Sequence, residues 1–571
     1  MRKKTTVFLT LLLLFSSFFL IFEKTKAAQT LQFKPFFTET ADEVLAQMSL
    51  DEKIGQILIF GFWGDSLDEN FQTWLTTGEL GNIKIFLRNV ETGEQLQGLT
   101  NLVIALAAES EYGIPPFIAT DMEGGTVNHI RFEGIPLAPS AGLIGASGNF
   151  ENARNTARLI ALTLLEFGIN MNFAPVVDIL TNPENRVIST RSYGSDPQRV
   201  YEFSKIFIQE HEKLGIITVL KHFPGHGMTS FDSHLFSDSV DISREDLFNV
   251  HILPYRKLIR EGKTGGIMVS HIIYNDIDPE YPAAFSTVVI NNLLREELKY
   301  DGLVITDDLE MEGSQGYAKD IVDAFILAFR AGNDLLLVAH TEKLQKKLLD
   351  TAAGLFKNGT LSEDALDQKV LRVLKAKKKY LSRFYTNMSF EKEHETALKQ
   401  SAEIVEKASN EGIVLLTSNI EGSIPDYFKL TTEKNQKGLI LSPNSDFTDN
   451  VKKHLPDWEV LDIGSFPERE LNKKRAKEAQ HLLKKYDIII LGFTSIRQIE
   501  WAEACIQENI PFAILSINNP LTPMRFADYT LFLATSFGPH SPATDALYKN
   551  VFETGVFTGI FPYHFDEIIN D

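Results

Sequence analysis

Residues 302–339 read GLVITDDLEMEGSQGYAKDIVDAFILAFRAGNDLLLVA, with an apolar run at each end and a helical pattern between them. The runs 302–307 and 334–339 are rich in Val, Ile and Leu without polar alternation, which is typical of strands buried on both faces. Residues 319–331 have apolar side chains at helical spacing. A strand, a helix and a second strand in this order predict one unit of a parallel sheet.

The same alternation extends back toward the N-terminus. Six further apolar runs read as strands: 56–62, 82–87, 116–122, 170–178, 216–222 and 266–272. Helix-period segments such as 151–167, 197–214 and 244–260 lie between them. Eight buried strands interleaved with helices predict an α/β fold, a (β/α)8 TIM-type barrel over residues 40–385, in which the chemistry lies at the carboxyl ends of the strands.

A second α/β region follows the barrel. The Lys-rich helical segment 363–381 closes the barrel, and the polar stretch after it predicts a linker over residues 386–400. Five more apolar runs come next: 438–441, 458–463, 486–493, 511–517 and 529–534. They predict a smaller parallel-sheet domain with α/β/α sandwich layers over residues 401–571.

The composition is that of an ordinary globular protein, and the net charge argues against two classes of binding partner. Of its 571 residues, 44% are apolar, and 56 Lys and Arg against 76 Asp and Glu give a net charge of −20. Such an acidic chain argues against nucleic acid or an anionic membrane as a partner. Cys505 is the one cysteine, so a Cys-based metal cluster is excluded, and we expect this side chain to be a buried small hydrophobe.

The N-terminus has the features of an export signal. Basic residues at positions 2–4 precede the apolar run 7–22, and Thr25 and Ala27 place small residues where a signal peptidase cleaves. We therefore expect residues 1–27 to be a signal peptide and the protein to be secreted, periplasmic or associated with the cell wall. The run is shorter than the roughly 20 residues of a membrane span, so an uncleaved anchor is the less favoured interpretation.

The densest group of polar residues follows the fifth predicted strand. Residues 221–234 read KHFPGHGMTSFDSH, where Pro and two Gly force an irregular loop. So many polar groups are costly to bury without a function. Two chemistries fit at this point. His222, His226, His234 and Asp232 could ligate a metal, or Asp232 and His234 could form a dyad in which the carboxylate orients the imidazole and stabilises its protonated form.

Other predicted strands also end in charged residues. Asp307 is the first charged residue after its apolar run, so we expect its carboxylate to project at the barrel mouth, where it could attack an anomeric carbon. We expect Asp308 to be the structural member of that pair. Asp121 lies near two glycines after the third strand, and Arg191 follows the fourth, where its guanidinium can bind a polar substrate group.

At these residues the chain resembles family 3 glycoside hydrolases, in particular their bacterial β-N-acetylhexosaminidase branch. Residues 221–234 are similar to the KHFPGHG-x-T-x-x-DSH signature of that branch. Further matches occur in family order: SLDEKIGQ at 49–56, D-x-EGG at 121–125, RSYG at 191–194 and TDDL-x-M at 306–311. ATSFG at 534–538 and TGIFP at 558–562 resemble the second domain of two-domain members.

The resemblance implies a retaining, two-step mechanism that needs no cofactor or metal. Asp307 would be the nucleophile that forms a glycosyl-enzyme intermediate, and His234, paired with Asp232, would be the general acid and then the general base. The side chains that would hold a non-reducing terminal N-acetylglucosamine are Asp121, Arg191, Lys221 and His222. Two positions depart from the family pattern: His129 stands where Arg is frequent, and Met228 where a polar residue is frequent.

We therefore expect an exported exo-β-N-acetylglucosaminidase that acts on peptidoglycan fragments or chitin-type oligosaccharides. Alternatives are a β-glucosidase or xylosidase of the same family, a metal-dependent barrel hydrolase, and a non-catalytic sugar-binding protein. β-Glucosidases and xylosidases of this family commonly take their general acid from the second domain. Segment 232–234 argues against such an acid in this chain, because it would supply the acid from the barrel. A histidine acid/base also leaves open phosphate, in place of water, as the glycosyl acceptor.

Overall fold

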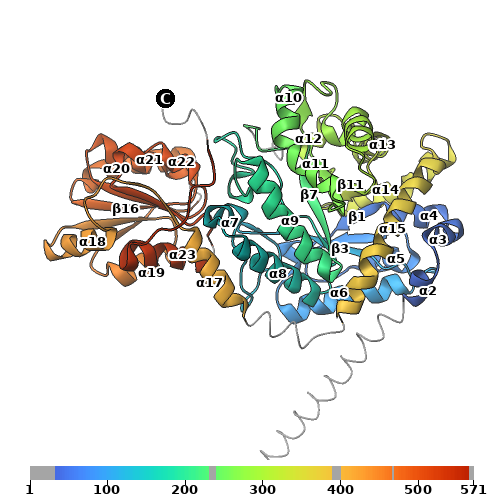
Figure 1. Cartoon of the computed structure of the whole chain (residues 1–571), viewed down its shortest axis with the longest axis horizontal. Helices are drawn as coiled ribbons and strands as arrows, with labels where there is room; N and C mark the ends of the chain where they lie inside the picture. The colour runs from blue at the N-terminus through green and yellow to red at the C-terminus, as the bar shows by residue number, and fades with distance from the viewer. Residues whose placement is uncertain (1–32, 231–238, 389–399, 466–467, 540, 565–571) are drawn as a thin grey trace, which may run out of the picture.

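The computed structural model describes residues 33–230, 239–388, 400–465, 468–539 and 541–564 (Figure 1). Two bodies of α/β structure make up these residues, a larger N-terminal one and a smaller C-terminal one. The predicted signal peptide, residues 1–27, lies outside the described residues. In the part of the chain that is described, no helix has the length and apolar character needed to cross a membrane.

The N-terminal body is built on one sheet that contains all eight predicted strands. They are β1 (Leu58–Gly61), β2 (Asn82–Lys84), β3 (Phe117–Thr120), β6 (Met171–Asn172), β7 (Ile217–Phe223), β9 (Gly266–Val269), β11 (Leu303–Thr306) and β12 (Leu336–Val338). They pair in parallel in the order β11-β9-β7-β6-β3-β2-β1-β12. A parallel bridge between Ile305 and Leu335 joins the two ends of this order. The predicted (β/α)8 barrel is confirmed.

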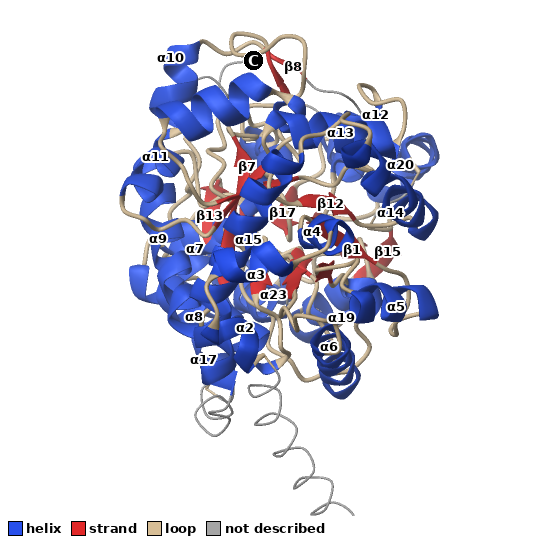
Figure 2. Ribbon diagram, turned by 90° about the vertical axis from the view of Figure 1, so that its right-hand side faces the viewer, coloured by secondary structure: helices blue, strands red, loops and turns tan. Residues whose placement is uncertain are grey.

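Helices surround these strands (Figure 2). They are α2 (Lys34–Thr38), α3 (Ala41–Gln47), α4 (Leu50–Gln56), α5 (Glu69–Thr77), α6 (Gly93–Ala108), α7 (Ala141–Ser147), α8 (Phe150–Glu166), α9 (Pro197–Leu214), α11 (Leu253–Arg260), α12 (Glu312–Gln315), α13 (Ile321–Ala331), α14 (Glu342–Lys357) and α15 (Glu363–Met388). Helix α9 has the predicted bounds because Asp196 caps its first amides, Pro197 opens it and Gly215, at φ +80°, ends it.

One predicted helix, 244–260, is divided in the structure. It consists of α10 (Arg244–Asp246), the π-helical η3 (Leu247–His251) and α11. Pro254 has no amide hydrogen to donate to the carbonyl of residue 250, so α-helical bonding is interrupted there. The amide of Ile252 instead donates to the carbonyl oxygen of Leu247, five residues earlier, at 2.8 Å, which is π-helical spacing.

Short elements complete the loops above the barrel. The ten-residue, π-helical η5 (Val288–Glu297) belongs to the helical layer; the short loop elements are η1 (Leu87–Asn89), β4 (Met122–Gly124) paired with β5 (Val127–Asn128), η2 (Ser189–Arg191), β8 (Ser239–Val240) paired with β10 (Ile273–Tyr274), and η4 (Ala283–Phe285). Most of them follow the carboxyl ends of strands, where the site residues were predicted.

The C-terminal body contains the five predicted strands and one that was not predicted. They are β13 (Val414–Ser418), β14 (Gly438–Ser442), β15 (Glu459–Asp462), β16 (Ile488–Phe493), β17 (Phe512–Ser516) and β18 (Phe532–Thr535). The order is β13-β18-β17-β16-β14-β15, and β13 runs antiparallel to β18. The five predicted strands pair in parallel, as expected, and the antiparallel strand is the one that was not predicted. Strand β13 lies at an edge and is only partly buried, and the prediction missed it although residues 413–416 read IVLL, a continuous apolar run.

Helices cover both faces of this second sheet, as predicted for an α/β/α sandwich. In Figure 1, α18 (Ile424–Glu433), α19 (Ser445–His454) and α23 (Ser541–Lys549) lie below β16, and α20 (Arg469–Leu483), α21 (Ile499–Gln507) and α22 (Leu521–Met524) lie above it. Cys505 on α21 is fully buried, as expected, and burial raises the pKa of its thiol to about 12.

The junction between the two bodies differs from the predicted linker. Helix α15 extends to Met388 because Phe384, Tyr385 and Met388 are buried, with the ring of Tyr385 5.5 Å from that of Phe33. The first three residues assigned to the linker are therefore helical, and residues 389–399 lie outside the described residues. Helix α17 (Ser401–Gly412) then packs on the barrel, where its Glu411 accepts hydrogen bonds from Asn149 and Asn152.

Candidate active site

A buried group of charges lies at the carboxyl ends of β2, β3 and β7. The Nζ atom of Lys221 on β7 lies 2.5 Å from Asp121 Oδ1 and 2.6 Å from Glu123 Oε1. The Nζ atom of Lys84, the last residue of β2, lies 2.7 Å from Asp121 Oδ2. Two predicted site residues, Asp121 and Lys221, are thus in direct contact, although 99 residues separate them in the sequence.

Arg191 joins this group through Glu123. Its Nε and Nη2 atoms each lie 2.8 Å from one carboxylate oxygen of Glu123, which is a bidentate pair. Its Nη1 atom donates to the carbonyl oxygen of Val187, at 3.1 Å. Glu123 therefore connects Arg191 to Lys221. We call Lys84, Asp121, Glu123, Arg191 and Lys221 the charge cluster.

The cations of the charge cluster keep its two carboxylates ionised. Burial alone would raise the pKa of Asp121, but Lys221 and Lys84 outweigh that effect and hold it well below its ordinary value. Burial acts on Glu123 in the same way, and Arg191 and Lys221 lower its pKa. The carboxylates in turn raise the pKa of Lys221 against its burial. Asp121 and Glu123 are therefore anionic at neutral pH, and Lys221 and Arg191 are cationic.

His129 lies beside the charge cluster without adding to its charge. Its Nδ1 atom is 3.7 Å from Asp121 Oδ2. Burial lowers the pKa of His129 to about 4, although Asp121 opposes this, so the imidazole is neutral at pH 7. An arginine is frequent at this position in the family that the sequence resembles and would be positively charged, whereas His129 is uncharged at pH 7.

His222, the next residue on β7, is held by a carboxylate that sequence reasoning missed. Its Nδ1 atom lies 2.8 Å from Asp178 Oδ2, and the backbone amides of His222 and His226 also donate to Asp178, at 3.2 and 2.7 Å. Asp178 is fully buried, and His222 lowers its pKa against the effect of burial. The Nδ1–H tautomer of His222 is thereby favoured, which leaves Nε2 for a substrate. The sequence signal for Asp178 is its place as the one acidic residue of the apolar run 170–178, at the end of that run.

Asp307 lies at the predicted end of the barrel. It follows β11 directly, its amide donates to the carbonyl oxygen of Val269 at 3.0 Å, and its side chain is partly buried. Its Oδ1 atom accepts the amide hydrogen of Asp308, at 2.9 Å. Asp308 is buried and accepts from the amides of Glu310 and Ala339, at 3.0 and 3.3 Å, so it ties the ends of β11 and β12 together.

Asp232 and His234, the predicted acid/base pair, lie outside the described residues. The described end of their loop is fixed by Asn182, whose Nδ2 atom donates to Ser230 Oγ at 2.9 Å and to the carbonyl oxygen of Thr229 at 3.1 Å. The loop that follows the fourth strand thus supports the loop that leads to the pair. How the pair lies relative to Asp307 remains a prediction from the sequence.

The metal alternative involves the same loop. Of its four proposed ligands, His222 directs Nδ1 to Asp178, and His226 places Nδ1 2.9 Å from Thr229 Oγ1. The other two, Asp232 and His234, are not among the described residues. Across the described ranges, no three His, Cys, Asp or Glu side chains come together as metal ligands.

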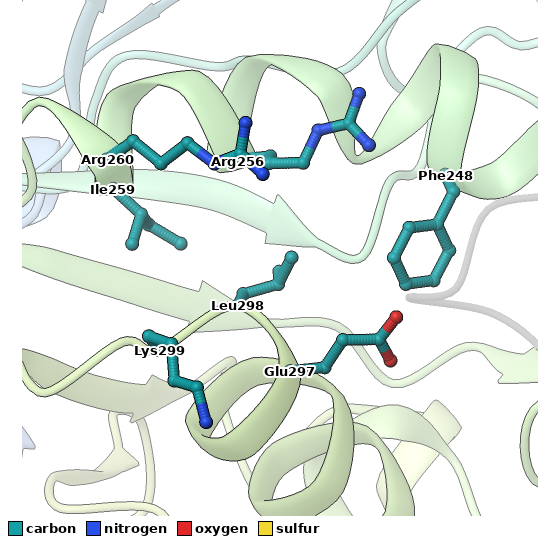
Figure 3. Close-up of a pocket in the computed structure, with 7 residues that line it drawn as sticks. All are labelled: Phe248, Arg256, Ile259, Arg260, Glu297, Leu298 and Lys299. Carbon is teal, nitrogen blue, oxygen red and sulfur yellow. The ribbon is translucent and has the colours of Figure 1, made fainter.

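Two cavities lie away from the charge cluster. One of about 380 Å³ lies between the helix that carries Arg256 and Arg260 and the segment that carries Glu297, Leu298 and Lys299 (Figure 3). A second of about 780 Å³ is lined by residues of η5, α13 and α15. Neither is lined by a predicted site residue, so both belong to the helical layer outside the barrel.

Comparison with known proteins decides the family. Residues 49–376 match the N-terminal domain of glycosyl hydrolase family 3. The chain belongs to this family. The matched residues include every barrel motif quoted from the sequence, from SLDEKIGQ at 49–56 to TDDL-x-M at 306–311. The family resemblance inferred from the sequence is therefore confirmed.

Relatives within glycosyl hydrolase family 3 indicate a glycosidase. β-Hexosaminidase A of Pseudoalteromonas piscicida is 33% identical over 322 residues, which are 53% of this chain and 54% of that protein. The chain thus spans about half the length of that relative. β-Hexosaminidase of Idiomarina loihiensis is 33% identical over 297 residues, 51% of this chain and 86% of that one. The solved family 3 β-N-acetylglucosaminidase from Paenibacillus sp. str. FPU-7 has a TM-score of 0.77 and 27% identity, over 90% of this chain and 99% of that one.

Glu123→Gln tests whether the charge cluster acts as a unit. The neutral amide leaves Arg191 and Lys221 with one anion too few in a buried site. We expect the free energy of unfolding to fall by about 3 kcal/mol and kcat/KM to fall roughly 100-fold. Chemical denaturation and steady-state hydrolysis of an aryl N-acetyl-β-glucosaminide measure the two effects.

Glu184→Gln is the matched control for this variant. Glu184 is exposed and lies 3.8 Å from Arg186 and 3.5 Å from Arg525, so its loss should change stability by no more than about 0.5 kcal/mol. The interpretation of the charge cluster is wrong if Glu123→Gln and Glu184→Gln behave alike in both measurements.

Proposed function

We propose that this chain is an exported, retaining exo-β-N-acetylglucosaminidase. It removes the non-reducing terminal N-acetylglucosamine from peptidoglycan fragments or chitin-type oligosaccharides. The observation that carries the proposal is the charge cluster itself, which brings Asp121, Arg191 and Lys221 together at the end of the barrel where Asp307 also lies. The relatives named β-hexosaminidase and the solved β-N-acetylglucosaminidase support the choice of an N-acetylated sugar.

The charge cluster suits the recognition of a sugar ring. A pyranose presents hydroxyl groups that both donate and accept hydrogen bonds. The carboxylate of Asp121 can accept from such hydroxyls, and the cationic groups of Lys221 and Arg191 can donate to them. Because these side chains already hold one another in a buried network, little conformational freedom is lost when a sugar binds.

In the proposed first step, a carboxylate oxygen of Asp307 attacks the anomeric carbon from the face opposite the leaving group. The bond between that carbon and the glycosidic oxygen breaks, and protonated His234 gives its proton to the departing oxygen. The products are a glycosyl ester on Asp307 and the free aglycone, which diffuses away. Asp232 stabilises the imidazolium before this transfer.

In the second step, neutral His234 removes a proton from a water molecule, whose oxygen attacks the anomeric carbon and releases Asp307. Two inversions at this carbon give net retention of the β configuration. The same imidazole therefore serves as acid and then as base. A charged acceptor such as phosphate could replace water, because a neutral base does not repel an anion as a carboxylate would.

Export is part of the proposal and rests on the sequence. The basic, apolar and small-residue pattern within residues 1–27 supports a cleaved signal peptide. Expression of the full chain in a bacterial host, followed by N-terminal sequencing of the extracytoplasmic protein, tests it. A mature chain that begins at Ala28 is expected, and a chain that stays in the cytoplasm with Met1 intact argues against export.

Substrate preference provides the test of the function. A panel of aryl β-glycosides that differ only at C2, with acetamido or hydroxyl groups, should show kcat/KM at least about 100-fold higher for the N-acetylglucosaminide, because a site built for a polar group discriminates strongly against its absence. A higher kcat/KM for the glucoside would favour the β-glucosidase alternative. Adding inorganic phosphate to the same assay shows whether the product is the free sugar or a sugar phosphate.

Asp307→Ala should reduce kcat roughly 10⁴-fold or more, because it removes the attacking oxygen while the backbone contacts of residue 307 remain. Labelling of the wild-type chain with a slow 2-fluoro sugar, followed by peptide mass spectrometry, should place the adduct on Asp307. Asp301→Asn, at the opposite end of the same strand, is the matched control and should retain full activity. An active, folded Asp307→Ala protein excludes the assignment.

His234→Gly should slow cleavage of a natural disaccharide far more than glycosylation by a nitrophenyl glycoside. An alkoxide needs protonation to depart, whereas a nitrophenolate is already a stable anion. Asp232→Ala should act in the same direction but less strongly, because it leaves the imidazole in place though poorly oriented. The comparison requires pre-steady-state rates of the bond-breaking step, since His234 also acts in the second step. Equal losses for both leaving groups would show that His234 is not the general acid.

A further inference from the structure

The end of the second domain runs back onto the barrel. The amide of Ile560 donates to the carbonyl oxygen of Ala146, at 2.8 Å, and the amide of Ser195 donates to the carbonyl oxygen of Pro562, at 3.1 Å. The amide of His564 then donates to Ser195 Oγ, at 2.7 Å. In Figure 1 this dark red segment lies between the two bodies. These contacts fix the last described residues of the chain beside the loop that follows η2.

Tyr563 extends this contact to the loop that carries Arg191. Its side chain is 2% exposed, and its hydroxyl lies 3.2 Å from the carbonyl oxygens of Ser189 and Ser192, which flank Arg191. The hydroxyl shares its proton between these two acceptors. The packing is tight, because a Cβ atom added at Gly142 would lie 2.5 Å from the Tyr563 hydroxyl oxygen.

The loop that carries Arg191 is not in a relaxed conformation. Ser189 has φ +40°, which a residue with a side chain rarely adopts and which costs free energy. Its buried Oγ atom also has no hydrogen-bond partner among the described residues. Such a segment keeps one conformation only where neighbouring structure holds it, and Tyr563 supplies hydrogen bonds on both sides of Arg191.

We propose that Tyr563 is a positioning residue for Arg191. It holds the backbone on each side of Arg191, so that the guanidinium keeps its bidentate pair with Glu123 and faces the sugar site. The second domain thereby takes part in substrate binding through the end of its chain, without placing a side chain on the substrate. The effect on sugar binding rests on the function proposed above, whereas the effect on the loop does not.

Tyr563→Phe removes only the hydroxyl and tests the proposal. Loss of this hydrogen bond should lower kcat/KM for an aryl N-acetyl-β-glucosaminide roughly three- to tenfold, mainly through KM. In an Arg191→Lys background the further loss should shrink to less than about twofold, because Tyr563 acts through Arg191. The same three- to tenfold decrease in both backgrounds would show that Tyr563 does not act through Arg191 and would overturn the proposal.

Tyr385→Phe is the matched control. Tyr385 is also buried, and its hydroxyl has no hydrogen-bond partner among the described residues. Its removal should leave kcat/KM within about twofold of the parent in both backgrounds. A loss as large as that of Tyr563→Phe would mean that any buried tyrosine hydroxyl produces the effect, which contradicts a specific role for Tyr563.

Hydrogen exchange separates this proposal from the proposed function. In the full-length Tyr563→Phe protein, the amides of residues 187–195 should exchange about fivefold faster or more, while Tyr385→Phe leaves them unchanged. This result does not depend on the substrate, so it stands even if the wild-type chain cleaves no N-acetylglucosaminide. Unchanged exchange in Tyr563→Phe overturns the proposal. If that variant does not fold, Ser195→Ala, which removes the acceptor of the His564 amide, replaces it.

Discussion

The ammonium group of Lys221, held between the carboxylates of Asp121 and Glu123, is the interaction on which the site depends. A buried lysine and two buried acids would each be very unfavourable alone, and each is stable here because the others are present. The three residues come from β7 and from the segment after β3. Arg191 adds the loop after β6, so the charge cluster fixes the relative position of several strand ends in the barrel.

This arrangement links fold stability to function. Parallel strands bring their carboxyl ends to one edge of the barrel, and the loops there are free to vary. In this chain buried charges connect those loops in addition to apolar packing. The same groups that hold the loops can exchange hydrogen bonds with the hydroxyls of a sugar. His222 is held in a similar way, because Asp178 fixes its ring through Nδ1 and the pair does not occupy Nε2.

The sequence predicts the strands of the barrel well, because strands buried on both faces are continuous apolar runs. It misses the edge strand β13, although residues 413–416 are all apolar, because a short apolar run does not by itself distinguish a strand from the end of the helix before it. It also misses the interruption near Pro254, where a helical pattern continues through a divided helix. It also identifies acids at strand ends, such as Asp121 and Asp307. It does not identify their partners, because a pattern along the chain carries no information on which strand ends meet across the barrel.

Glu123 and Asp178 illustrate this limit. Both stand at positions where an acid follows an apolar run, yet their roles follow from contacts with Arg191 and His222, which are distant in the sequence. Tyr563 has no sequence signal for its position, because its partners precede it by more than 370 residues. Residues that act on the site through other residues are therefore the ones that a sequence pattern misses and a structure supplies.

A crystal structure of the Asp307→Asn protein with a bound N-acetylglucosamine disaccharide would test the central claim most directly. The account predicts that the terminal sugar contacts Asp121, Arg191 and Lys221, with its anomeric carbon about 3–3.5 Å from the side chain of residue 307. A sugar bound away from the charge cluster, or one whose anomeric carbon faces a different acid, would contradict it.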